Sequence, residues 1–358
     1  MKRANKLVGS WMRAAGMSVR EDAAFNLIGR LPSTKRGAKC LVIGSHLDTV
    51  RNAGKYDGPL GVLLGIAVAQ QLRGHKLPFH LEVVGFSDEE GVKYQTTYLG
   101  SRAMCGLLSA RDLSRVREKG LARAKRSKNE LLAYLEAHIE QGPVLENERK
   151  VIGVVESALG QRWFDVVVEG QDAHAGPTPI ELRRDALLAA SRLVQAVREV
   201  ATKHPHYARG TVGRMIVSPN SRNVIPGRVE LSIDLRNADA PTLDAMAADV
   251  RAAAERIARE DGVSISMEQT VHFPPCAFDR SMLDAIEATA NAYAYPNRRL
   301  ASGAGHDAVY VARTCPAAMV FVPCEKGISH NEIENADPAH LHAGCNVMLH
   351  AVLARANR

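Results

Sequence analysis

The stretch that decides the fold is residues 39–86, which contains KCLVIGSH (39–46), LGVLLGIAVAQQLRG (60–74) and FHLEVVGF (79–86). The first and third segments are short, continuous apolar runs, which are typical of buried strands. The middle segment has the length of a helix, and Gly74 closes it. A strand, a helix and a second strand in this order predict a βαβ unit, and therefore a parallel sheet covered by helices.

A different pattern begins near residue 160. RWFDVVVEG (162–170) alternates like a half-exposed strand, and amphipathic helices are expected at 182–203 and 242–260, with three further strands around them. This strand–helix–strand–strand–helix–strand order predicts a split βαβ, ferredoxin-like α+β domain. The α/β pattern then returns, with helices expected near 280–293 and at 338–355 and a strand at 317–323.

One domain is therefore expected to interrupt another. We predict an α/β domain formed by residues 1–158 and 276–358, with a mixed, mostly parallel sheet flanked by helices. A smaller α+β domain, residues 159–275, is inserted into it.

The composition argues against several classes of protein. Of 358 residues, 46% are hydrophobic and 24% charged, which is ordinary for globular proteins. The net charge of +7 comes largely from a basic run at 110–129, and no nucleic-acid-binding motif accompanies it, so we interpret it as a solvated surface. No apolar run approaches the ~18 residues of a membrane span, no signal peptide is visible, and the six cysteines are scattered. These features predict a cytoplasmic protein that binds neither membrane nor nucleic acid.

Histidine and carboxylate residues follow the predicted strands. GSHLDTV places His46 and Asp48 directly after the first strand, two residues apart and so on one face of an extended chain. SDEEG follows the second strand and brings two glutamates and an aspartate together. The glutamates of SDEEG are Glu89 and Glu90. Further candidates later or elsewhere in the chain are Asp57, His138, Glu140, Gln141 and His330.

Each of these residues, taken alone, has an ordinary structural explanation. Asp57 precedes Pro59, for example, and is well placed to cap a helix. Together they indicate a functional site, because open α/β sheets place their binding sites at the carboxyl ends of strands. Zn²⁺ and similar divalent ions accept this mixture of nitrogen and oxygen ligands. The candidates come from five separate segments, which is too many for one tetrahedral ion with an open position but suits two ions that share a carboxylate.

Nine segments carry a resemblance to a known family: GSHLDTV, DGPLGVLLGI, SDEEGVKY, YLGSRAM, HIEQGPVLE, GQDAHAGPTP, NVIPGRVELSIDLRN, SGAGHDA and GISHNE. In this order they resemble the carbamoylase branch of the two-metal aminoacylase and carboxypeptidase superfamily. That branch contains N-carbamoyl-L-amino-acid hydrolases, β-ureidopropionases and allantoate amidohydrolases. One departure is Asn52-Ala53-Gly54, where the family commonly has two glycines before the bridging aspartate.

The resemblance implies roles for individual residues. His46 and His138 would hold one divalent ion, Glu90 and His330 the other, and Asp57 would bridge both. Glu89 would be the general base, and Asp48 would orient His46. Zn²⁺ is the first expectation for both ions, and Mn²⁺, Co²⁺ and Ni²⁺ are open alternatives.

The resemblance also implies that the inserted domain is a lid and forms a homodimer. His174 would stabilise the tetrahedral intermediate. Further residues would contact a small carboxylate substrate, and without the resemblance Arg236 would be read as a strand-edge ion pair. These substrate-binding candidates are Gln161, Asn223, Arg236, Gly305 and His306.

The implied reaction is metal-dependent hydrolysis of a carbamoyl (ureido) C–N bond, with release of ammonia and carbon dioxide. The substrate would be an N-carbamoyl-L-amino acid or allantoate, and the sequence does not separate the two. The alternatives are an aminoacylase or dipeptidase of the same superfamily and a catalytically inactive binding protein on this fold. A basic nucleic-acid binder is the remaining alternative.

Overall fold

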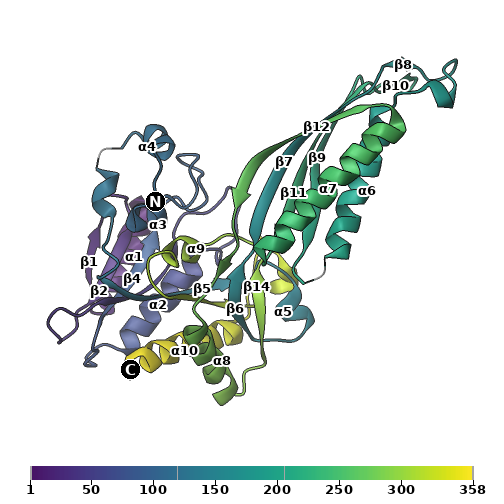
Figure 1. Ribbon diagram of the computed structural model, residues 1–358. Coiled ribbons are helices and arrows are strands. Elements are labelled where there is room, and N and C mark those ends of the chain that lie inside the picture. The colour runs from purple at the N-terminus through teal and green to yellow at the C-terminus, as the bar shows by residue number, and fades with distance from the viewer. Residues whose placement is uncertain (1, 119, 205, 357–358) are drawn as a thin grey trace. The chain divides into compact units, whose positions relative to one another are not determined.

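The computed structural model describes residues 2–118, 120–204 and 206–356 (Figure 1). The described residues form two compact units. The first extends up to Glu156 and resumes at Phe278, and the second comprises Ser157–Ala277. Each unit has its own sheet and its own helices.

The central sheet has nine strands in the order β1-β2-β4-β3-β5-β15-β6-β13, with β14 paired to β6. Strands β4, β3, β5 and β15 are parallel neighbours, and β1, β2, β6 and β13 pair antiparallel with their neighbours on the path. The predicted mixed sheet flanked by helices is therefore confirmed, with its parallel strands at the centre. The strands are β1 (Ser18–Glu21), β2 (Leu27–Leu31), β3 (Cys40–His46), β4 (His80–Phe86), β5 (Leu131–Ile139), β6 (Ile152–Ala158), β13 (Cys276–Ala277), β14 (Asn297–Ser302) and β15 (Ala317–Val322).

Helix α2 connects β3 to β4, as the opening stretch of sequence predicts. It begins at Pro59, whose missing N–H suits a first turn, and ends at Gln71 before Gly74 with a φ of 84°. Helix α10 packs against both α2 and α8, while α3 and α9 form a second pair that contacts the sheet. The helices of this unit are α1 (Lys2–Ala14), α2 (Pro59–Gln71), α3 (Leu99–Cys105), α4 (Ala110–Val116), α5 (Val144–Asn147), α8 (Arg280–Ala292), α9 (Asp307–Val311) and α10 (Pro338–Ala356), with short 3₁₀ turns at Leu121–Ala124 and Glu325–Gly327.

The second unit has a four-stranded antiparallel sheet in the order β12-β7-β11-β9, covered on one face by α6 and α7 (Figure 1). This is the split βαβ arrangement. Its core lies between alternate residues of β7, such as Phe164 and Val166, and apolar residues of the helices, such as Leu193 and Val250. The elements are β7 (Gly160–Glu169), β8 (Ala173–His174), a 3₁₀ turn (Ile180–Leu182), α6 (Ala186–Lys203), β9 (Arg209–Ser218), β10 (Val224–Ile225), β11 (Arg228–Asn237), α7 (Ala240–Asp261) and β12 (Ser264–Phe273).

The basic run at 110–129 forms α4, a 3₁₀ turn and the connecting loops, with Lys119 outside the described residues. Most of its described side chains are exposed, but Arg126 is not: it pairs with the buried carboxylate of Glu82. All six cysteines are free thiols. Among the described helices, none combines the length and the apolar character that a membrane crossing requires.

Candidate metal centre

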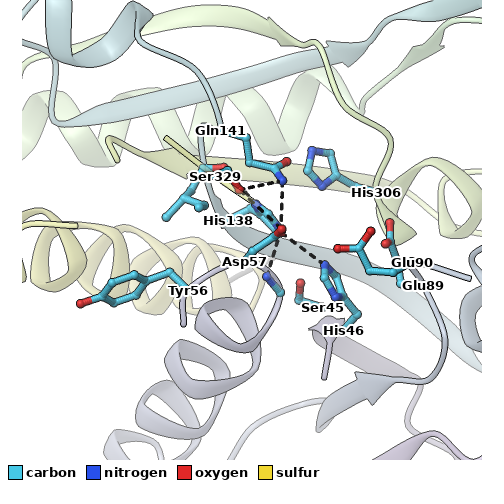
Figure 2. A network of polar contacts seen from close by, with 12 residues as sticks. Ser45, His46, Tyr56, Asp57, Glu89, Glu90, His138, Gln141, His306 and Ser329 are labelled. Carbon is cyan, nitrogen blue, oxygen red and sulfur yellow. Dashed lines mark hydrogen bonds and ion pairs between the residues drawn. The ribbon is translucent and has the colours of Figure 1, made fainter. Parts of the chain in front are cut away.

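The predicted ligands come from the carboxyl ends of neighbouring strands and meet at one edge of the sheet (Figure 2). Parallel strands end at the same edge, so residues far apart in sequence come together there. His46 is the last residue of β3, and His138 lies next to the end of β5. Asp57 precedes α2, the two glutamates follow β4, and His330 lies in the loop between β15 and α10.

The first ligand cluster contains His46, His138 and Asp57, all buried. Nε2 of His46 lies 3.7 Å from Oδ1 of Asp57, and Nε2 of His138 lies 3.3 Å from the same oxygen. The other ring nitrogen of each histidine faces a backbone carbonyl at 2.9 Å, that of Asp48 for His46 and that of Ile139 for His138. Since a carbonyl only accepts, Nδ1 carries the proton, and Nε2 presents its lone pair to the cluster.

The second ligand cluster contains Asp57, Glu90 and His330. Nε2 of His330 lies 2.9 Å from Oδ2 of Asp57 and 3.6 Å from Oε1 of Glu90. Asp57 thus offers Oδ1 to the first cluster and Oδ2 to the second, which is the arrangement of a bridging carboxylate. The ligand atoms of each cluster lie within 4.8 Å of one another, and the mixture of imidazole and carboxylate fits borderline divalent ions.

Gly58 shows how closely the backbone approaches this centre. A Cβ at this position would lie 2.3 Å from the ring of His46, and the φ of Gly58 is 84°. Both facts require glycine between Asp57 and Pro59. Its N–H lies 3.2 Å from Nε2 of His138, which again identifies that nitrogen as an acceptor.

Glu89 lies beside the centre and is buried, with 6% of its surface exposed. Burial raises the pKa of its carboxyl well above the usual range, and the negative charges of Asp307 and Glu90 add to the shift. With His46 and Glu90 it forms a third group whose candidate ligand atoms lie within 4.8 Å of one another. A raised pKa suits a group that takes up a proton and releases it.

Asp48 contacts the centre through both its backbone and its side chain. Its backbone carbonyl, rather than its carboxylate, accepts from Nδ1 of His46. The carboxylate accepts from the backbone N–H groups of Glu89 and Glu90, both at 3.1 Å. Asp48 therefore shapes the turn that carries the two glutamates.

His306 and Gly305 lie close to the first cluster. The ring of His306 is buried and meets the ring of His138 edge-on at 4.7 Å, while its Nε2 lies 2.8 Å from the hydroxyl of Ser302. A Cβ on Gly305 would lie 2.0 Å from the hydroxyl oxygen of Tyr98. The backbone of this segment therefore packs directly on a tyrosine.

The other substrate-binding candidates and His174, the predicted stabiliser of the intermediate, belong to the second unit, where they form two groups. Gln161 and Arg236 face each other on β7 and β11, and Arg236 forms an ion pair with Asp234 at 2.7 Å. His174 is exposed on β8, and the carbonyl of Asn223 accepts from the N–H of Ala175 beside it.

Three residues near the centre were not predicted: Glu136, Ser329 and Glu334. Glu136 is fully buried on β5 and accepts from the hydroxyls of Ser45 and Tyr134, both at 3.0 Å. Glu334 and Ser329 lie beside Asp57. A signal was present for Glu136, because LLAYLEAHI places an acid inside an otherwise apolar run. Glu334 has no such signal, since it lies in a polar loop.

The chain is similar to known proteins over nearly its whole length. Residues 42–354 match the model described as "Peptidase family M20/M25/M40". An N-carbamoyl-L-amino-acid amidohydrolase from Rhizobium meliloti is 37% identical over 98% of this chain and 88% of that protein. An allantoate amidohydrolase from Bacillus subtilis is 34% identical over 94% of this chain and 86% of its own length. The crystal structure of a hydantoinase/carbamoylase-family amidase from Burkholderia multivorans superposes with a TM-score of 0.92, at 41% identity, and covers 99% of this chain and 90% of that one.

Proposed function

The chain belongs to peptidase family M20/M25/M40 and is a hydrolase acting on linear amides, and from this premise we propose that it is a two-metal carbamoylase. Its substrate is a small carboxylate that carries a ureido group, either an N-carbamoyl-L-amino acid or allantoate. The observation that carries this proposal is Asp57, which offers one oxygen to each of two ligand clusters beside the buried Glu89.

The proposed cofactors are two divalent ions, with Zn²⁺ as the first candidate and Mn²⁺, Co²⁺ or Ni²⁺ as alternatives. His46 and His138 would hold one, Glu90 and His330 the other, and Asp57 both. When bound, such ions polarise the carbonyl of the substrate and lower the pKa of water. The donor set supports this assignment, because both buried histidines present an unprotonated Nε2 to a carboxylate.

Glu89 is the proposed proton carrier. Its carboxylate takes a proton from the attacking water and passes it to the leaving nitrogen. For a carbamoyl amino acid, one water is consumed, and the products are the amino acid, ammonia and carbon dioxide. For allantoate the products are ureidoglycine, ammonia and carbon dioxide. Asp48 supports this step by holding the backbone of Glu89.

The remaining roles are proposals that rest on the resemblance. Residues 1–158 and 276–358 would be the catalytic domain, and 159–275 a lid through which a homodimer forms in the cytoplasm. The developing oxyanion would be stabilised by His174. An arginine fork is the natural partner of a substrate carboxylate, which supports the role of Arg236. The other proposed substrate contacts are Gln161, Asn223, Gly305 and His306.

A substrate panel tests the proposal. The metal-loaded enzyme is assayed with N-carbamoyl-L-amino acids, N-carbamoyl-β-alanine and allantoate, with ammonia release as the readout. N-acetyl amino acids and dipeptides belong in the same panel, because the family model that matches is named for peptidases. Their hydrolysis releases no ammonia and is followed through the free α-amino groups that it produces. Ammonia release from ureido substrates at a kcat/KM well above that for acyl substrates is expected. Preference for a dipeptide or an acyl amino acid would replace the carbamoylase with the peptidase alternative.

A further inference from the structure

Glu334 is a buried carboxylate with no assigned part in the reaction, and only 2% of its surface is exposed. It lies in the loop between β15 and α10, four residues after His330. Its Oε1 accepts from the backbone N–H groups of Tyr56 and Asp57, at 2.8 and 3.1 Å. Its Oε2 accepts from the hydroxyl of Ser329 at 2.9 Å. One side chain therefore ties together two loops that lie 277 residues apart in sequence.

The same hydrogen-bond network includes the carboxylate of Asp57 (Figure 2). Nε2 of Gln141 donates to Oδ1 of Asp57 at 3.2 Å and approaches the hydroxyl oxygen of Ser329 at 3.3 Å. Because Ser329 has one proton, it donates to Glu334 and accepts from Gln141. We call this group of Tyr56, Asp57, Gln141, Ser329 and Glu334 the Glu334 clasp. It fixes both the backbone and the side chain of the bridging aspartate.

Gly54 provides a second, independent sign that the clasp is tightly packed. A Cβ at this position would lie 2.2 Å from both Cβ and Oε1 of Glu334. No side chain fits there unless Glu334 moves. Gly54 is the only glycine of Asn52-Ala53-Gly54, and it is the residue of this segment that packs against the clasp.

The two ligand clusters depend on the clasp to different degrees. His46 and His138 lie on β3 and β5, are buried, and are oriented by carbonyls that do not belong to the clasp. His330 lies in a loop, its side chain is 50% exposed, and its φ is 55°. The adjacent residue Ser329 is hydrogen-bonded to Glu334. The second ligand cluster is therefore the one whose geometry rests on this loop.

We propose that Glu334 is a positioning residue for the second metal ion, the ion held by Asp57, Glu90 and His330. It does so by fastening the loop of His330 to the loop of Asp57. This inference rests on the proposed two-metal function. Without the carboxylate, two backbone N–H groups lose their acceptor and the two loops are free to separate. Partners of metal ligands typically contribute about 10- to 100-fold to metal affinity.

Metal binding by the full chain tests this inference without an activity assay. The chelator-stripped protein is titrated with Zn²⁺ by isothermal calorimetry, and bound zinc is counted after equilibrium dialysis. Wild type is expected to bind two ions. Glu334→Ala is expected to bind the first ion, which His46 and His138 still hold, with much the smaller loss of affinity, and the second about 10- to 100-fold more weakly. His330→Ala marks the complete loss of the second ion, and Glu332→Ala, an exposed acid two residues away, is expected to match wild type.

Glu334→Gln extends the test to a variant of the same shape. Its amide oxygen still accepts from Tyr56 and Asp57, but its amide nitrogen cannot accept from Ser329, so an intermediate loss of second-ion affinity is expected. A folded Glu334→Ala or Glu334→Gln protein that binds both ions as wild type does would overturn the inference, and so would an equal loss of both ions. Wild type that binds fewer than two ions would instead overturn the two-metal function on which the inference rests.

Discussion

At the scale of single residues, the turn after β4 explains how adjacent acids acquire different surroundings. Asp88 has a φ of 49° and Gly91 one of 69°, so the backbone leaves the strand conformation between them. The carboxylate of Asp88 accepts from the N–H groups of Lys93 and Tyr94 and closes the loop. Glu90 then reaches His330, while Glu89 stays buried beside Asp307.

This division of roles predicts the behaviour of Glu89→Gln. Glutamine keeps the size of the side chain but cannot take up the proton, so kcat is expected to fall by about 10²–10⁴-fold. Metal content and the unfolding midpoint are expected to stay near wild type, because Asp57, Glu90 and the three histidines remain. Glu255→Gln, an exposed position on α7, is the matched control. Wild-type turnover in Glu89→Gln would remove Glu89 from the mechanism.

Gly54→Ala tests the packing at the clasp from the opposite side. The new methyl group would meet Glu334 at 2.2 Å, so the loop or the carboxylate must shift. Overpacking of this kind costs about 1–3 kcal/mol of unfolding free energy. Urea unfolding followed by circular dichroism measures the loss. Gly213→Ala on β9, where a Cβ meets nothing within 4 Å, is expected to be nearly neutral, and equal effects at the two positions would contradict the packing argument.

The proposed metal ligands and the residues that position them were not equally predictable. The ligands could be proposed because histidine and acid groups follow predicted strands, and because motif order carries a family resemblance. The Glu334 clasp could not be predicted from the sequence, because its hydrogen bonds join segments that are far apart in the chain. The carbonyl contact of Asp48 was equally hidden, since residue type says nothing about which backbone group faces a ring.

At the scale of elements, periodicity predicts the helices α2, α6, α7, α8 and α10, but not α1 or the short helices, and it places helix ends less well. The amphipathic pattern indicates a helix from residue 182, yet α6 begins at Ala186. Asp185 sets this start, because its side chain accepts from the N–H groups of Leu187 and Leu188. Strand β5 gives a weaker signal, because Glu136 and His138 interrupt its apolar run. The short edge strands β1, β13 and β14 have too few buried residues to show a pattern.

Asp185→Ala measures the contribution of this cap. The unfolding free energy of the second unit is expected to fall by about 1 kcal/mol, because the first turn of α6 loses its acceptor. Chemical denaturation gives the change directly. Asp185→Asn is the control, since asparagine is also a good N-cap residue and should restore most of the stability. If alanine and asparagine behave alike, the helix start depends on something other than the side-chain cap.

At the scale of the whole molecule, the order of sequence patterns was sufficient to predict a mixed α/β sheet and a separate antiparallel sheet. Each pattern is local, and the connections follow from chain order. The order of the strands within the sheet could not be predicted in this way. The neighbours of β15 are β5 and β6, and its pairing with β5 joins residues far apart in sequence. Long-range pairing of this kind is specified by packing, which leaves no periodic signal in one chain.

The distribution of ligands between the two units leads to a prediction for metal removal. All five proposed ligands lie in the first unit, while the second has its own core of residues such as Phe164 and Val250. A ligand that binds only the native state stabilises it, by about 4 kcal/mol at a thousand times its Kd. Stripping the metal with a chelator is therefore expected to speed hydrogen exchange where β3, β4 and β5 end. The amides of β7, β11 and α6 should keep their protection.

Mass spectrometry of peptides from the exchanged protein resolves the two regions, and adding Zn²⁺ back is the control for reversibility. Equal loss of protection in both units, or none in either, would contradict a metal centre built by the first unit alone.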